Sequence, residues 1–317
     1  MIYSTELEKI KEQNGTEVLK NRFEKALIKN TTDAVTLIND KGISFSTFYI
    51  LIPLLKKYNT FNKLNLRNRI AQKLYDECFS TSAPQVTYTR SNEIYVLNWI
   101  VNSAAYDDGI DDNFDKMVDY AFAKLLDENS EPLIIENAIN LAFMRNSKNE
   151  FNHDLIWAIF RTGNPEALRI VAKHLASDDN EEKEFSKTLL ENAMDDGLDD
   201  EEVRFADIDK WIEENKPYLK FTGNGYNYST SPRFCEIDTK SKYMGKSKKE
   251  SGFPMNIPQT QTQLENISSF KKLDYKTQVI LSRYSKFLHD TDIEKWNRWQ
   301  RQSLQKQVET VYGIREV

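Results

Sequence analysis

Two acidic stretches contain the residues best suited to metal chemistry. The motif Asp-Asp-Gly-(Ile/Leu)-Asp-Asp occurs twice, 88 positions apart, with one conservative change between the copies. Carboxylate oxygens are preferred ligands of Ca²⁺, so a calcium loop is the first interpretation to test. The aspartates concerned are Asp107, Asp108, Asp111 and Asp112 in the first copy and Asp195, Asp196, Asp199 and Asp200 in the second.

The spacing does not fit an EF-hand loop. Such a loop has oxygen ligands at positions 1, 3 and 5, glycine at position 6 and glutamate at position 12. With Gly109 at position 6, positions 1 and 3 are Ala104 and Tyr106. With Gly197 at position 6, position 3 is Met194. We therefore expect no metal ion at either copy.

A helix-to-helix turn explains both copies better. The glycine of each copy suits the left-handed residue that ends a helix. One aspartate after it, Asp111 or Asp112 in the first copy and Asp199 or Asp200 in the second, then caps the next helix. The two aspartates before each glycine lie at a helix C-terminus, where negative charge is unfavourable. That placement leaves a cation or a basic partner as the one functional interpretation of these turns.

No other residues form a catalytic or metal-binding motif. The histidines His153, His174 and His289 lie far apart, and Cys78 and Cys235 lack metal-ligand spacing. The segment from Gly245 to Ser247 ends like a nucleotide-binding P-loop, but the earlier glycine that this motif requires is absent. We therefore expect neither an enzyme nor a bound cofactor.

The spacing of apolar residues predicts that helices position these residues. Short amphipathic segments follow one another up to about residue 215, and from Glu93 onward each spans about 14–18 residues between short polar turns. We predict an all-α protein with three parts. An α-solenoid-like body of short antiparallel helices covers 1–215, an extended arm covers 216–262, and a pair of basic helices covers 263–317.

One segment supports the solenoid prediction by resemblance. Residues 162–194, "TGNPEALRIVAKHLASDDNEEKEFSKTLLENAM", have a polar turn, a helix opened by Asn-Pro, an acidic turn and a second amphipathic helix. This unit resembles a HEAT repeat, and the resemblance to the HEAT/armadillo-like superfamily covers about residues 90–215. It implies an α-solenoid, and proteins of this kind are mostly scaffolds and adaptors.

The arm differs from the helical body in composition. It contains four of the eight prolines and four of the ten glycines, without helical periodicity. A disordered linker and an extended arm lying on a protein surface are both compatible with this composition. Its aromatic residues favour the second interpretation, because linkers are usually poor in them. Lysines interleaved with Tyr243 also permit contact with nucleic acid.

Charge is distributed unevenly along the chain. Residues 1–100 contain 14 Lys and Arg against 10 Asp and Glu, residues 101–215 contain 11 against 29, and residues 216–317 contain 18 against 10. Solvated helix faces would explain this pattern, and so would complementary surfaces that bind one another. The N-terminus has no apolar signal segment and no run is long enough to span a bilayer, so we expect a cytoplasmic protein without membrane insertion.

Together these features predict a non-enzymatic scaffold or structural subunit of a multiprotein assembly. It would bind protein partners, including other copies of itself, through the arm, the basic helices and residues 101–215, which we call the acidic middle. The alternatives are a nucleic-acid-associated factor that uses the basic tail, and an inhibitor or immunity-type protein that uses the acidic face. The candidate partner-binding residues are Phe221, Tyr226, Tyr228, Phe234, Lys240, Tyr243, Lys246, Lys248, Lys249, Trp296, Arg298, Trp299 and Arg301.

Overall fold

The structure, a computed structural model, describes residues 5–107, 110–128, 131–191, 205–222, 233–246 and 260–315. Within these ranges the chain is all-α, as predicted, apart from one two-stranded sheet. It divides into two compact units, Met1–Thr162 (unit 1) and Gly163–Val317 (unit 2). None of the helices in these ranges has both the length and the hydropathy needed to cross a membrane.

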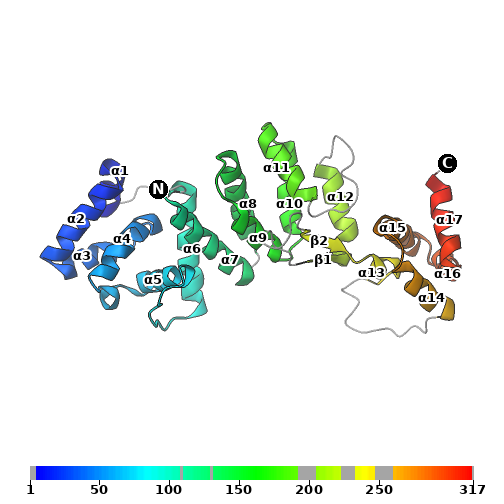
Figure 1. Cartoon of the computed structure of the whole chain (residues 1–317), viewed down its shortest axis with the longest axis horizontal. Helices are drawn as coiled ribbons and strands as arrows, with labels where there is room; N and C mark the ends of the chain where they lie inside the picture. Colours follow the sequence, from blue (N-terminus) through cyan, green and yellow to red (C-terminus); the bar gives the residue numbers. More distant parts are fainter. Residues whose placement is uncertain are drawn as a thin grey trace. The chain divides into compact units, whose positions relative to one another are not determined.

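Unit 1 consists of helices that pack against close neighbours in the sequence, such as α2 against α3 and α6 against α7 (Figure 1). The elements of this unit are α1 (Glu6–Asn14), α2 (Thr16–Lys29), α3 (Thr31–Ile38), α4 (Phe45–Lys57), the 3₁₀ helix η1 (Phe61–Lys63), α5 (Leu66–Cys78), α6 (Arg90–Asp107), α7 (Asp112–Glu128), α8 (Pro132–Ser147) and α9 (His153–Arg161).

Local sequence explains where several of these helices begin. The side chains of Thr5, Asn30 and Ser44 accept hydrogen bonds from backbone N–H groups in the first turns of α1, α3 and α4. Asn65 does the same for α5. Such caps satisfy backbone donors that have no partner inside the helix, so each of these residues fixes a helix start.

An aromatic cluster forms part of the core of unit 1. The ring of Phe45 in α4 contacts Trp99 of α6 edge-on, with centroids 5.4 Å apart, and stacks on Phe114 of α7 at 6.1 Å. Tyr49, one turn after Phe45, contacts Phe114 at 5.2 Å. These contacts hold α4 against α6 and α7, the first of which begins more than thirty residues after α4 ends.

Unit 2 contains the remaining helices and the sheet. Strand β1 (Leu219–Phe221) pairs antiparallel with β2 (Cys235–Ile237), with Leu219 opposite Ile237. The other elements are α10 (Glu166–Lys173), the 3₁₀ helix η2 (His174–Ala176), α11 (Asn180–Glu191), α12 (Phe205–Asn215), the 3₁₀ helix η3 (Lys216–Tyr218), α13 (Thr239–Tyr243), α14 (Gln261–Phe270), α15 (Tyr275–Thr291), α16 (Ile293–Gln300) and α17 (Leu304–Arg315).

The compact units divide after Thr162, whereas the sequence placed a division after residue 215. The side chain of Asn215, at the end of α12, accepts a hydrogen bond of 2.7 Å from Lys242 of α13. Phe221 of β1 packs against Gly163, with carbon atoms 3.6 Å from the position of a Cβ there. These contacts make residues 163–215 part of the same unit as the C-terminal helices.

The described part of residues 216–262 is folded, which corrects the prediction of an extended arm. It contributes η3, the sheet and α13 to unit 2. Phe234, Cys235 and Tyr243 are almost completely buried. Burying these apolar side chains stabilises the folded arrangement over an extended one. Residues 223–232 and 247–259 lie outside the described ranges.

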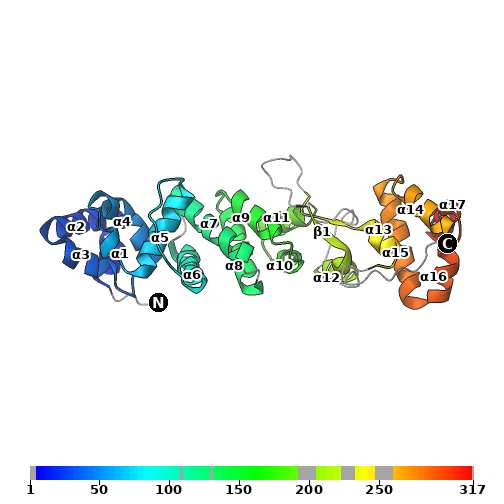
Figure 2. The ribbon, with the colours of Figure 1, turned by 90° about the horizontal axis from the view of Figure 1, so that it is seen from below.

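Four helices, α14 to α17, rather than the predicted pair, occupy the described residues 260–315 (Figure 2). The first break comes between α14 and α15, where the Asp274 side chain accepts from the backbone N–H of Thr277 and caps α15. The second comes between α16 and α17, where buried Asn266 of α14 donates to the carbonyl oxygen of Gln302 and accepts from the N–H of Leu304. Asn266 thus supplies the polar partners that an interrupted helix needs.

Candidate functional site

Three of the aromatic residues predicted to bind a partner are buried. Phe234 is 2% exposed, Tyr243 0% and Trp299 4%. Tyr243 stacks on Phe270, with ring centroids 4.4 Å apart, and contacts Trp299 edge-on at 5.8 Å. The side chains of Tyr243, Phe270 and Trp299 therefore form part of the core that joins α13 to the C-terminal helices. No partner can reach the buried rings of Phe234, Tyr243 and Trp299 in this structure.

A buried polar network accompanies the same core. The hydroxyl of Tyr243 donates to Oε1 of Gln307 at 2.7 Å, and its carbonyl oxygen accepts from Ser285 at 2.6 Å and from Gln300 at 2.9 Å. Trp296 donates from Nε1 to Oγ of Ser285 at 2.9 Å. Trp296, another candidate for partner binding, is only partly buried. These bonds fix α13 against α15, α16 and α17.

The candidate cations of the C-terminal helices remain on the surface. Arg298 and Arg301 are exposed, and so are Lys295 and Lys306. None of the four forms an ion pair with a described residue. We call these four residues the basic face. Ile293, at the start of α16, is 49% exposed beside them in the sequence.

The candidates from the predicted arm divide into three groups. Lys246 is exposed, whereas Lys240 and Phe221 are partly buried. The remaining residues, Tyr226, Tyr228, Lys248 and Lys249, lie outside the described ranges. Phe221, Lys240 and Lys246 therefore belong to unit 2. Arg298 and Arg301 of the basic face are predicted site residues that the structure leaves exposed.

Lys242, one of the lysines that interleave with Tyr243 in the sequence, is buried instead of exposed. Its ammonium group donates to Oδ1 of Asn215 at 2.7 Å. Burial lowers the pKa of Lys242 to about 8, and nearby Arg283 and Lys286 act in the same direction, while Glu214 opposes them. A buried ammonium group with a neutral partner is unfavourable, so Lys242 lowers the stability of the fold, and its burial leaves it inaccessible in this structure.

The first acidic turn is a helix start, as predicted. Oδ1 of Asp111 accepts from the backbone N–H of Phe114 at 2.8 Å and from the Tyr49 hydroxyl, also at 2.8 Å. Asp112 is the first residue of α7 and is exposed. Asp107 is the last residue of α6. The other five aspartates of the two turns, Asp108, Asp195, Asp196, Asp199 and Asp200, lie outside the described ranges.

Among the described residues, no group of three or more His, Cys, Asp or Glu side chains is arranged to hold a metal ion. Several carboxylates of the acidic middle form ion pairs with Arg169 instead. Arg169 of α10 binds Glu166 at 2.8 Å and also Asp209 and Glu213 of α12, at 2.6 and 2.5 Å. These ion pairs join α10 to α12.

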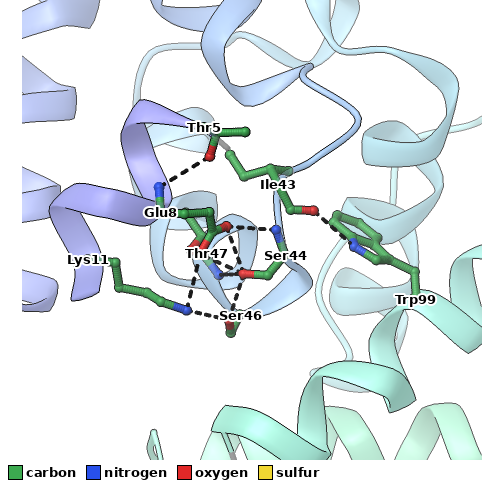
Figure 3. Close-up of polar contacts among 8 residues, drawn as sticks. All are labelled: Thr5, Glu8, Lys11, Ile43, Ser44, Ser46, Thr47 and Trp99. Atoms are coloured by element: carbon green, nitrogen blue, oxygen red, sulfur yellow. Dashed lines mark hydrogen bonds and ion pairs between the residues drawn. The ribbon is translucent and has the colours of Figure 1, made fainter. Parts of the chain in front are cut away.

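A buried carboxylate in unit 1 is the most elaborate polar site that the sequence did not reveal (Figure 3). Glu8 of α1 has no exposed surface. Its Oε1 accepts from the backbone N–H of Ser44 at 2.7 Å and from the Ser44 hydroxyl at 2.9 Å. Its Oε2 accepts from the hydroxyl of Thr47 at 2.8 Å and lies 3.6 Å from Nζ of Lys11.

The residue types of this site resemble those of a Ser–Lys hydrolase, but its geometry is structural. Nζ of Lys11 donates to Oγ of Ser46 at 2.7 Å (Figure 3). Ser46 has no exposed surface, so a substrate cannot reach its hydroxyl oxygen. Glu8 lies at the N-terminus of α4, where a negative charge is favourable. The site therefore anchors α1 to α4.

The sequence carried one signal for this anchor. Ser44, Ser46 and Thr47 are a run of hydroxyl residues in front of an apolar helix, which is typical of an N-cap. No local pattern connects them with Glu8, which lies 36 residues before Ser44.

The chain was compared with protein-family models, with curated protein sequences and with solved structures, and none of them matched.

Proposed function

We propose that this chain is a non-enzymatic scaffold or structural subunit of a multiprotein assembly that binds neighbouring protein chains through the basic face. The acidic middle and the aromatic segment 216–262 supply further contacts. The HEAT-like α-solenoid arrangement of residues 90–215 remains part of this proposal, because scaffolds commonly use helical-repeat surfaces.

One observation carries the proposal. Lys295, Arg298, Arg301 and Lys306 are exposed and have no ion pair with a described residue. Many cations of unit 1 lie against a carboxylate, as in the pairs of Lys73 and Lys124 with Glu77. An arginine side chain binds a carboxylate through two parallel hydrogen bonds, so Arg298 and Arg301 suit an acidic protein surface.

The test compares two variants of equal charge change in the full-length chain. Variant R298E/R301E/K306E reverses the basic face. Variant R22E/K25E/K29E reverses three cations of α2 that are exposed too. Each chain is used to capture proteins from cells that express it, after nuclease treatment, and the captured proteins are cross-linked and identified by mass spectrometry.

The proposal expects a stoichiometric protein partner that the α2 variant retains and the basic-face variant loses. Capture of the same proteins by both variants would contradict it. Salt-dependent retention of the chain on DNA or RNA that is lost in the basic-face variant would instead support a nucleic-acid-associated factor. A partner held through the acidic middle and unaffected by either variant would favour the inhibitor-type alternative.

A further inference from the structure

Unit 2 contains two regions of opposite charge. Residues 163–215 contain 17 Asp and Glu against 6 Lys and Arg, whereas residues 216–317 contain 10 against 18. Net charges of −11 and +8 therefore lie in one compact unit. Such a separation produces fields that orient molecules as they approach one another.

Helix α11 presents a stripe of carboxylates in the acidic region. Glu181, Glu184 and Glu191 are exposed, and they follow one another at intervals of three and seven residues. Residues at these intervals lie on one face of a helix. Glu181 and Glu191 form no ion pair with a described residue, and Glu184 pairs only with Lys187 of its own helix. We call these three residues the acidic stripe.

The first interval of the basic face matches the first interval of the acidic stripe. Lys295 and Arg298 lie three residues apart on α16, as Glu181 and Glu184 do on α11. Arg301 follows three residues later, at the end of α16. Two helices with stripes of opposite charge at the same rise of about 1.5 Å per residue can therefore pair side by side. No ion pair between the two stripes occurs within the described part of the chain.

We propose that the partner of the basic face is the acidic stripe of a second copy of this chain. This inference rests on the proposed function and names its partner. Each copy carries both surfaces, so two copies can pair them reciprocally about a two-fold axis or in a head-to-tail arrangement. Reciprocal pairing closes a dimer, whereas head-to-tail pairing builds rings or open chains.

The strength of the association follows from the exposure of both stripes. Solvent-exposed ion pairs are individually weak and are screened by salt. Exposed Ile293, before the first cation of the basic face, adds apolar contact area. We therefore expect a reversible association that weakens at least about tenfold when the salt concentration rises from about 50 mM to about 500 mM.

Sedimentation velocity on the full-length chain tests this inference, with three variants beside the natural sequence. Variant R298E/R301E/K306E reverses three of the four cations of the basic face, so that this face and the acidic stripe are both negative. Variant E181K/E184K/E191K reverses the acidic stripe, so that both surfaces are positive. The third, R22E/K25E/K29E, changes α2 and is the control. Circular dichroism of each variant checks that the helices are intact.

At low salt the natural chain and the α2 control should form concentration-dependent species larger than a monomer. Each stripe variant alone should be a monomer, because its two stripes repel one another. An equimolar mixture of the two stripe variants should associate again, since the reversed charges are complementary. That recovery does not occur if a reversal simply damages the fold.

A natural chain that remains monomeric at low salt, at concentrations up to about 100 µM, would overturn the inference, as would a mixture that stays monomeric. A monomeric natural chain would not by itself contradict the proposed function. A monomeric chain that still loses another captured protein on reversal of the basic face would keep the scaffold proposal and reject self-association.

Discussion

Nζ of Lys242 lies 2.7 Å from Oδ1 of Asn215 in the interior of unit 2, and no carboxylate among the described residues pairs with it. Burial lowers the pKa of Lys242 from its ordinary value of 10.5 to about 8. Below pH 8 the lysine is protonated in both the folded and the unfolded chain. Between pH 8 and 10.5 only the unfolded chain binds this proton, so the free energy of unfolding rises with pH.

We predict that the rise approaches about 3 kcal/mol across this window. Lys242→Met should abolish it, as measured by urea unfolding between pH 7.5 and 10.5. Lys240→Met, a change on the same helix at a half-exposed lysine, is the control and should keep the slope. Equal slopes in the two variants would show that Lys242 is not the titrating group.

The Glu8 anchor predicts a large loss of stability on truncation. Glu8→Ala leaves the N–H and hydroxyl of Ser44 and the hydroxyl of Thr47 without their acceptor. We expect the free energy of unfolding to fall by about 3 kcal/mol, because buried donors are then unsatisfied. Glu12→Ala changes an exposed glutamate of the same helix and should alter stability by less than about 0.5 kcal/mol. Urea unfolding measures both, and equal effects would reject the anchor.

Gly245, just after α13, lies where the structure leaves no room for a side chain. Its φ is +66°, and a Cβ added there would lie 2.7 Å from Cδ2 of His289. Gly163 has a nearly identical φ of +64°, but a Cβ there would meet only Phe221 at ordinary contact distance. Gly163→Ala should therefore cost about 1 kcal/mol for the left-handed backbone alone.

Gly245→Ala combines the same backbone effect with the clash. We expect it to lower the free energy of unfolding by about 2–3 kcal/mol. The difference between the two variants, measured by thermal or urea unfolding, isolates the contact with His289. A difference near zero would mean that the imidazole ring moves aside freely.

The thiol of Cys78 should react slowly in the folded chain. Burial raises its pKa to about 11, and its sulfur lies 3.8 Å from the carbonyl oxygen of Lys116. Since the thiolate is the nucleophile, alkylation by iodoacetamide at pH 8 should be roughly 100-fold slower than in urea. Peptide mapping by mass spectrometry separates Cys78 from buried Cys235. A native rate equal to the unfolded one would contradict this environment.

The sequence by itself determined the features that depend on neighbours along the chain. Helical periodicity predicted the all-α class, and Asp111, one of the two caps predicted for the first acidic turn, does mark the start of α7. The exposed cations Arg298 and Arg301 could also be predicted, because their spacing places them opposite Trp296 and Trp299 on α16. Each of these inferences needs contacts within about one or two helical turns.

Only the tertiary structure decided which polar and aromatic residues are inside. Tyr243 bonds to Gln307, 64 residues away, and Glu8 bonds to Ser44 at a distance of 36 residues. Lys242 looks like a surface lysine until α12 and α15 cover it. Burial depends on which elements pack together, and elements distant in sequence leave no periodic signal of their meeting. For that physical reason the sequence predicted the helices of this protein, but not the interior that they enclose.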